Sequence, residues 1–283
     1  MKEQSTPNSE FEDMVIIGDE NFAMGIPYWT PEELISDFVK CFKTYYGESI
    51  EKHKILTIAE ESKKIFFDLA VVKAEIKDIQ SDFGKFKERP NETKGLFHAE
   101  AALQRLYPTF QSAILMVNMG RIFEAAALCK LILEQLAWVF FVYKKDDDSV
   151  YDIKPSSCIT KLKEIIPETG IAYGRYNTFA HMNPEVKDEY IAEYQSQQVV
   201  KFNHPNRRKF FVLDLLFLVD SYRIVTELIT FEYHPDPKAW DKLEDGNFRL
   251  KQNRPLTLII ENTCKNIKGN DELKKIYKLQ EKI

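Results

Sequence analysis

Apolar residues recur every three or four positions along most of this 283-residue chain, which is the spacing of one face of an α-helix. Four segments carry the pattern most strongly and predict the core of a helical bundle. They cover approximately residues 96–119, 121–143, 156–182 and 206–231. Gly120 separates the first two segments, and Pro167 interrupts the third, so that a new helix is expected from about 168 to 182. No segment shows the alternation that is typical of a strand.

Two more helices are expected before this core. The first runs from about Pro31 to Gly47, because Thr30 is a favourable N-cap and proline suits the first helical position. The second runs from about Ile50 to Phe83, where apolar residues again follow helical spacing.

The remaining regions give weaker patterns. Residues 184–205 are mixed, with a helical part expected around Tyr190 to Val200, and Asn206 is expected to cap the long helix that follows. The charged tail is expected to form one or two short helices. The chain therefore divides into a flexible N-terminus (1–28), an N-terminal helical region (29–92), a helical core (93–235) and a charged helical tail (236–283).

Composition supports an all-α protein and argues against several other classes. Only 10 Gly and 12 Pro are present, too few for an all-β protein with many tight turns. The net charge of −5 gives no support for broad, sequence-independent binding to nucleic acid. The two most apolar stretches, Leu128–Tyr143 and Phe210–Val225, are short and contain charged residues, so we expect no membrane span. The N-terminus does not resemble a signal peptide, and we expect a cytoplasmic protein.

Neither metal nor cofactor chemistry is indicated by the sequence. The four cysteines are far apart and include no C-x-x-C pair, which argues against a zinc site and a disulfide framework. No predicted helix carries the Glu-x-x-His pattern of di-metal bundles. A P-loop, a glycine-rich dinucleotide turn and a G-x-S-x-G sequence are also absent.

The strongest candidate for chemistry is Arg175 together with His181. Five residues separate them near the end of a predicted helix, which Asn183-Pro184 terminates. This position places the imidazole beside unsatisfied backbone carbonyls, where the helix dipole favours a positive charge. Histidine is suited to general acid–base catalysis near neutral pH, and an arginine beside it can stabilise a pentacoordinate phosphate.

These residues resemble the R-x4–6-H motif of the HEPN superfamily of helical proteins, many of which are RNases. Where that family often has a polar residue directly after the arginine, this chain has Tyr176 and then Asn177. The segment Gly120–Ala125 also resembles a G-R-x-x-E-A sequence of a bacterial branch, which continues with a basic residue and a glutamate, here Lys130 and Glu134. Tyr176, Thr178 and His181 match the tyrosine, small hydroxyl residue and histidine of its later helix. The resemblance covers about residues 95–232.

The resemblance implies a HEPN-like four-helix core and a metal-independent endoribonuclease. His181 is expected to transfer protons and Arg175 to stabilise the phosphorane that forms when a 2′-hydroxyl attacks the adjacent phosphorus. Such sites are usually assembled across a two-fold homodimer. The resemblance also implies a role in phage defence, toxin–antitoxin systems or stress response, with RNA as a possible substrate and an antitoxin or other protein as a possible partner.

Further residues are candidates for supporting this site. Asn177, Thr178, Arg121 and Glu124 are expected to support it from the two neighbouring helices. A compact basic cluster precedes the last core helix and can contact an RNA backbone. Its members are Lys201, Asn203, His204, Arg207, Arg208 and Lys209.

Structural explanations remain open for the same residues. Arg121 with Glu124, Lys130 with Glu134, and Asp220 with Arg223 are spaced to form salt bridges within one helix. His98 and His234 stand in polar surroundings and are expected at the surface. The alternative function is therefore a non-catalytic helical module that binds a partner protein, RNA or a nucleotide.

Overall fold

The computed structural model describes residues 60–83, 93–194, 197–202, 204, 207–232, 234, 236–244, 246–254 and 256–266. The α-helices in these ranges are α2 (Glu60–Phe83), α3 (Lys94–Asn118), α4 (Ile122–Val142), α5 (Ile159–Leu162), α6 (Thr169–Ala180), α7 (Lys187–Tyr190), α8 (Arg208–Ile229) and α9 (Thr257–Asn266). Short 3₁₀ helices cover Asp148–Asp152, Pro155–Cys158 and Pro184–Val186. Two antiparallel hairpins pair β1 (Ile191–Tyr194) with β2 (Gln197–Val200) and β3 (Trp240–Lys242) with β4 (Phe248–Leu250).

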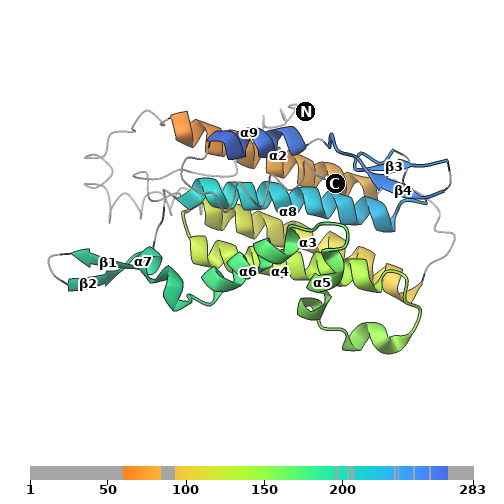
Figure 1. The fold of residues 1–283 in the computed structure, drawn as a ribbon, viewed down its shortest axis with the longest axis horizontal. Coiled ribbons are helices and arrows are strands. Elements are labelled where there is room, and N and C mark those ends of the chain that lie inside the picture. Colours follow the sequence, from red (N-terminus) through yellow and green to blue (C-terminus); the bar gives the residue numbers. More distant parts are fainter. Residues whose placement is uncertain are drawn as a thin grey trace, which may run out of the picture.

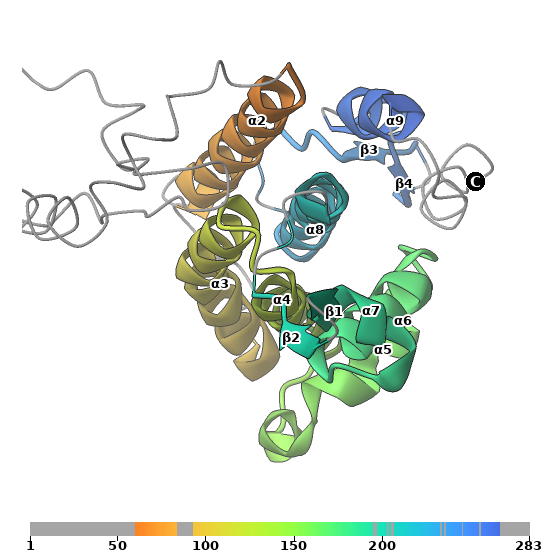
Figure 2. The same cartoon turned by 90° about the vertical axis from the view of Figure 1, so that its left-hand side faces the viewer.

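Helix α8 is the central element of the bundle. Of its 22 residues, 18 are buried, and apolar residues occur on all sides of the helix together with six buried polar residues, among them Asp214, Asp220 and Arg223. It packs against α2, α3, α4 and α9, and Figure 2 shows it nearly end-on among them. The largest packed pair is α3 with α4, and α6 covers the outer side of α4. One hydrophobic core runs from α2 to α9.

The start of α3 lies against the end of α4. The Thr93 hydroxyl accepts a hydrogen bond from the Leu96 amide at 3.0 Å and donates one to the Tyr143 carbonyl at 2.8 Å. The Gly95 amide donates to the Lys145 carbonyl at 2.8 Å, so the two backbones lie in direct contact. Gly120 has a φ of 69°, a left-handed conformation that suits glycine, and it turns the chain from α3 into α4.

Three of the four predicted core helices are confirmed within a few residues, as α3, α4 and α8. The interruption of the third segment at Pro167 is confirmed, and so is the helix expected from about 168 to 182, which is α6. The helix expected before Pro167 is shorter than predicted, because it consists of a 3₁₀ turn and the four-residue α5. Pro155 and Pro167 lack an amide hydrogen, and neither can sit within a continuous helix without loss of a hydrogen bond.

The prediction that the chain contains no strand is wrong. The region expected to be helical around 190–200 forms the β1–β2 hairpin, which projects from one end of the bundle in Figure 1. In the tail, β3 and β4 pair across a turn in which Gly246 has a φ of 83°, and α9 is the short helix found among the described residues up to 266. Short strands of three or four residues give too little alternation to be detected in a sequence.

Some expectations lie outside the described residues, namely the flexible N-terminus, the helix from Pro31 to Gly47 and the first turns of the helix expected from Ile50. Within the described ranges, α4 is the one helix long and apolar enough to cross a bilayer by length and composition. Half of its most apolar window is buried in the bundle, and buried core helices pass the same test.

Candidate functional site

Two polar stripes face each other where α6 lies against α4. Lys130 and Glu134 lie one turn apart on α4, and Tyr173, Asn177 and His181 follow every fourth residue along α6 and its C-cap. Residues four apart share one face of a helix, so each set forms a line along the helix axis. Packing of α6 on α4 brings the two lines together.

The side chains of these stripes form a continuous set of contacts. Lys130 Nζ donates a hydrogen bond to Asn177 Oδ1 at 2.8 Å and lies 3.0 Å from His181 Nε2. The same ammonium is 5.7 Å from the centre of the Tyr173 ring. At the other end, the Tyr173 hydroxyl donates to Glu134 Oε1 at 2.8 Å. We call these five residues the α4–α6 cluster.

The hydrogen bonds of this cluster fix the roles of its groups. Because the Lys130 ammonium can only donate, the neighbouring Nε2 of His181 acts as an acceptor, and the ring proton is assigned to Nδ1. Burial raises the pKa of Tyr173, and its hydrogen bond to the Glu134 carboxylate raises it further, to about 12. Tyr173 is thus a donor, and Lys130 is the group in the cluster that carries positive charge.

His181 stands at the exposed end of this cluster. It is the C-cap of α6, and its amide donates to the Asn177 carbonyl at 3.1 Å. Met182 has a φ of 48° and directs the chain away from the helix. Thr178, which was expected to support the site, donates instead to Glu185 Oε1 at 2.9 Å, which ties α6 to the following turn. The imidazole is therefore accessible while its backbone is held in place.

Arg175 lies on a different face of α6. Its guanidinium forms an ion pair with Asp214 of α8, whose side chain is only 1% exposed. The Tyr176 hydroxyl donates to the same Asp214 oxygen at 3.2 Å, and the guanidinium lies over the Tyr176 ring at 5.5 Å. Burial raises the pKa of Tyr176 well above its ordinary value. No contact described within the chain joins Arg175 to His181, so Arg175 anchors α6 to α8.

The remaining supporting candidates do not reach His181 through any described contact. Arg121 is the N-cap residue of α4, with its guanidinium 5.9 Å from the centre of the Phe202 ring, and Glu124 is exposed. The salt bridge expected between Lys130 and Glu134 is replaced by the contacts across to α6. A neighbouring helix offers closer partners than the next turn of the same helix.

The members of the basic cluster are held by different partners. Lys201 Nζ donates to the Asp188 carbonyl, and Arg207 forms a two-point ion pair with Glu189. Burial lowers the pKa of His204, which is only 6% exposed and lies edge-on to Phe123. Arg207 thus joins the start of α8 to α7, Lys201 joins the end of β2 to α7, and His204 packs on α4.

Two members of the basic cluster, Arg208 and Lys209, lie on α8 itself. Arg208 donates to the Asn118 carbonyl at 3.4 Å, and the Lys209 ammonium is 5.6 Å from the centre of the Phe210 ring. Asn203 lies outside the described residues.

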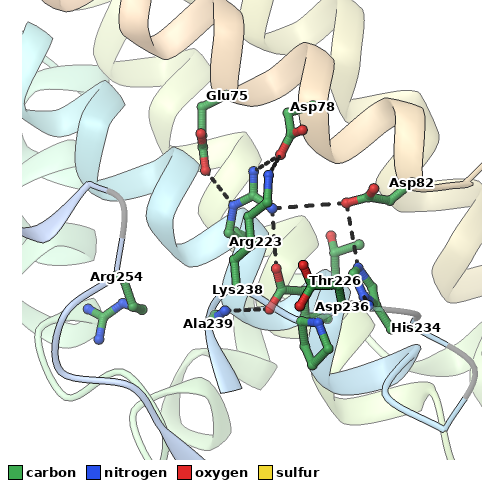
Figure 3. A network of polar contacts seen from close by, with 12 residues as sticks. Glu75, Asp78, Asp82, Arg223, Thr226, His234, Asp236, Lys238, Ala239 and Arg254 are labelled. Atoms are coloured by element: carbon green, nitrogen blue, oxygen red, sulfur yellow. Dashed lines mark hydrogen bonds and ion pairs between the residues drawn. The ribbon is translucent and has the colours of Figure 1, made fainter. Parts of the chain in front are cut away.

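A second polar cluster, centred on the buried Arg223, joins α2 to α8 (Figure 3). The guanidinium forms an ion pair with Glu75, with Asp78 at 2.6 Å and with Glu227 at 3.2 Å. Asp82 lies 4.0 Å from it. The expected pair between Asp220 and Arg223 is wrong, because Asp220 accepts from Arg254 at 2.8 Å.

This cluster also attaches the segment that follows α8. Lys238 lies 2.5 Å from Asp78, the Ala239 amide donates to Glu227 at 2.6 Å, and His234 is 3.5 Å from Asp82. The His234 side chain is 3% exposed, which corrects its expected place at the surface. Arg223 and Glu227, two charged residues of α8, thus attach α2 and the segment after α8 to the bundle.

No group of three or more His, Cys, Asp or Glu side chains suited to a metal ion occurs among the described residues. Cys129 and Cys158 are buried free thiols, and burial raises the pKa of Cys129 to about 12. Neither thiol is therefore a ready nucleophile.

Sequence reasoning found His181 and Asn177 but gave Lys130 and Glu134 only a structural role and missed Tyr173. The signal was present as the four-residue spacing of residues 173, 177 and 181. This spacing could not show that α4 packs against the face of α6 that carries these three residues. In comparisons with known proteins, no family model, curated protein or solved structure matches the chain significantly.

Proposed function

We propose that the protein is a metal-independent endoribonuclease of the HEPN kind, with His181 as the proton-transfer group and Lys130 as the phosphate-binding cation. The observation that carries this proposal is the 3.0 Å approach of Lys130 Nζ to His181 Nε2 at an exposed helix end. An accessible imidazole beside a fixed ammonium offers a base and a positive charge to the same phosphodiester.

The reaction can be written with these two groups alone. A bound phosphate draws the Lys130 ammonium to its oxygens, which frees His181 Nε2. The imidazole takes the proton of the 2′-hydroxyl as that oxygen forms a bond to phosphorus. The bond from phosphorus to the 5′-oxygen breaks, and this oxygen takes a proton from Lys130. The products are a 2′,3′-cyclic phosphate and a 5′-hydroxyl.

The enzyme is then restored by one proton transfer. After cleavage, His181 is protonated and Lys130 is a neutral amine. The 3.0 Å contact between them lets the proton return from the imidazole to the amine. No proton is gained or lost overall, and no metal ion is required.

Arg175 receives a different role in this proposal from the one its motif implies. Its charge is neutralised by a buried aspartate, so it positions α6, and through α6 it positions His181. The notion of a homodimer acting on RNA in phage defence, toxin–antitoxin systems or stress response rests on the resemblance of residues 175–181 and 120–134 to that superfamily.

The test uses the purified full-length chain with a labelled single-stranded RNA in excess EDTA. We expect cleavage with 2′,3′-cyclic phosphate ends, and a fall of about 10²–10⁴-fold in His181→Ala. His98→Ala is the matched control, since His98 is also a histidine on a helix, and its Nε2 lies 3.0 Å from the Tyr151 hydroxyl. Cleavage that persists in His181→Ala, or that requires Mg²⁺, contradicts the proposal.

A second candidate is the non-catalytic helical module, and one observation favours it. The guanidinium that the motif would direct at a phosphate is instead paired with Asp214. RNA that binds but stays intact, with binding weakened in Lys130→Met, would support this module.

A further inference from the structure

The β1–β2 hairpin is a sheet of two strands with an open edge on each side. Among the described residues, β1 and β2 pair only with each other, and the hairpin projects from one end of the bundle (Figure 1). All four residues of β2, Gln197–Val200, are exposed. A hairpin of two strands is only marginally stable in water, and further strands stabilise it. The hairpin therefore has both the space and a physical reason to accept another strand.

The base of the hairpin is attached to the bundle by polar and aromatic contacts. Arg207, at the start of α8, forms a two-point ion pair with Glu189, which lies just before β1. The Tyr190 ring lies edge-on to Phe123 of α4, with 5.8 Å between the ring centres. These contacts fix the direction in which the two strands leave the bundle. A preorganised edge loses less conformational entropy when it binds another strand.

The register of the hairpin identifies the backbone groups that face the open edge of β2. The Lys201 amide donates to the Tyr190 carbonyl at 2.8 Å, and the antiparallel register continues from this pair without a bulge. In an antiparallel ladder, hydrogen-bonded and non-hydrogen-bonded pairs alternate along the strands. Val199 is therefore bonded to β1, while the N–H and C=O groups of Gln198 and Val200 face away from it. An added strand would find these donors and acceptors unused by β1.

The side chains of β2 do not protect this edge. Val199 and Val200 lie on opposite faces of the strand, and they are 38% and 57% exposed. Edge strands of soluble proteins are commonly protected by charged residues, proline or a bulge, and the sequence of β2 contains neither a charge nor a proline. The other strand, β1, carries Glu193. The edge of β2 is therefore better suited to pairing than the edge of β1.

We propose that β2 pairs with β2 of a second copy of this chain, antiparallel, so that two hairpins form one four-stranded sheet across a two-fold axis. Antiparallel pairing of identical strands is self-complementary, because Gln198 of one copy lies opposite Val200 of the other and the reverse also holds. The two Val199 side chains then face each other at the axis, and no like charges meet. Four residues from each strand make a small interface, of the class below about 1,200 Å² that gives weak, reversible association.

The test is sedimentation equilibrium of the purified full-length chain without RNA. We expect a monomer–dimer equilibrium with a dissociation constant of about 10–100 µM. Val200→Lys places like charges close together on the paired edges and should weaken dimerisation by about tenfold or more. Leu258→Lys is the matched control, because Leu258 of α9 is also exposed, at 63%, and receives the same charge away from the hairpin. It should leave the dissociation constant unchanged.

A second variant separates backbone pairing from contact between apolar side chains. Val200→Pro keeps an apolar residue but removes the amide that faces the open edge, while the ladder bonds to β1 do not use that amide. It should abolish the dimer with an unchanged circular dichroism spectrum. A wild-type chain that stays monomeric up to about 0.5 mM would overturn the proposal and leave the edge to a strand of another protein. A dimer that persists in Val200→Lys or in a folded Val200→Pro would also overturn it. RNA cleavage is a separate question, because the α4–α6 cluster lies within one chain and shares no residue with β2.

Discussion

Lys130 and His181 are 51 positions apart in the chain, yet Lys130 Nζ lies 3.0 Å from His181 Nε2. The contact exists because α6 packs along α4 and because Asn177 accepts a hydrogen bond from the same ammonium at 2.8 Å. Lys130 is held between the two side chains of α6. This relationship defines the candidate site more closely than the pair predicted from spacing, Arg175 and His181.

The first prediction concerns the charge of Lys130. On the proposed function, Lys130→Met should lower RNA cleavage by about 10²–10³-fold, the loss that accompanies removal of one electrostatic stabiliser of a transition state. Single-turnover cleavage assays measure this. Lys161→Met is the control, because Lys161 makes an exposed pair with Glu164 at 2.9 Å, and it should retain full activity. A Lys130→Met enzyme as active as the control would remove Lys130 from the mechanism.

The second prediction concerns the ion pair between Arg175 and Asp214. Asp214→Ala leaves a largely buried guanidinium without its partner and should destabilise the fold by about 3–5 kcal/mol. Urea denaturation gives the free energy of unfolding. The double variant Arg175→Met with Asp214→Leu should recover part of the loss, because replacing a buried pair with apolar residues is often neutral, while the buried Tyr176 hydroxyl still lacks its acceptor. If the double variant is as unstable as Asp214→Ala, the anchoring role is wrong.

The third prediction concerns the cluster around Arg223. Arg223→Met leaves several carboxylates without their shared cation and should cost about 3–5 kcal/mol of stability. Arg249→Met removes an arginine whose side chain is 70% exposed and should change stability by less than about 0.5 kcal/mol. The two variants remove the same chemical group, so the difference between their unfolding free energies measures the effect of burial. Equal values would contradict the assigned anchor.

The fourth prediction concerns acid unfolding through Asp78. Partial burial acts to raise the pKa of Asp78, but hydrogen bonds from Lys238 and Arg223 outweigh it and hold the pKa below the ordinary value of 3.8. A carboxyl with a lowered folded pKa stabilises the fold above its unfolded pKa, and this stability is lost as pH falls through the folded pKa. Between pH 7 and pH 3, wild type should therefore lose more stability than Asp78→Asn. A steeper loss in the variant would contradict the assignment.

The fifth prediction compares two glycines in helices. A Cβ on Gly95 would overlap the Val142 carbonyl oxygen and lie 2.7 Å from that of Lys145, so Gly95→Ala should force the α3–α4 junction apart and lower the melting temperature. A Cβ on Gly174 meets nothing within 4 Å, and Gly174→Ala should stabilise α6 by up to about 1 kcal/mol. Thermal unfolding monitored by circular dichroism decides both. An unchanged melting temperature for Gly95→Ala would contradict the close approach.

The long helices could be predicted because each contains enough residues to show apolar positions at helical spacing. Apolar spacing located α3, α4 and α8, and Gly120 located the break between the first two. The short elements could not be predicted, because a strand of three or four residues, or a helix of four, has too few positions to show a period. The β1–β2 hairpin and the short helical turns from Pro155 to Leu162 are of this kind.

The candidate site was predicted in part for a similar reason. His181 at the end of α6 and Asn177 one turn earlier follow from local sequence. The partners of charged residues do not, because α4, a helix of 21 residues, packs against α3, α5, α6 and α8, and its own spacing does not tell which of them supplies a partner. Lys130, Asp214 and Asp220 each find their partner across an interface.

The sequence by itself thus determined an α-helical bundle and an exposed histidine at a helix end, because propensity, periodicity and capping act over a few residues. Only the tertiary structure decided that Arg175 is neutralised by Asp214, that Lys130 stands beside His181, and that Arg223 is shared by carboxylates of α2 and α8. These facts depend on how helices pack, and packing brings together residues whose separation in the chain carries no local signal.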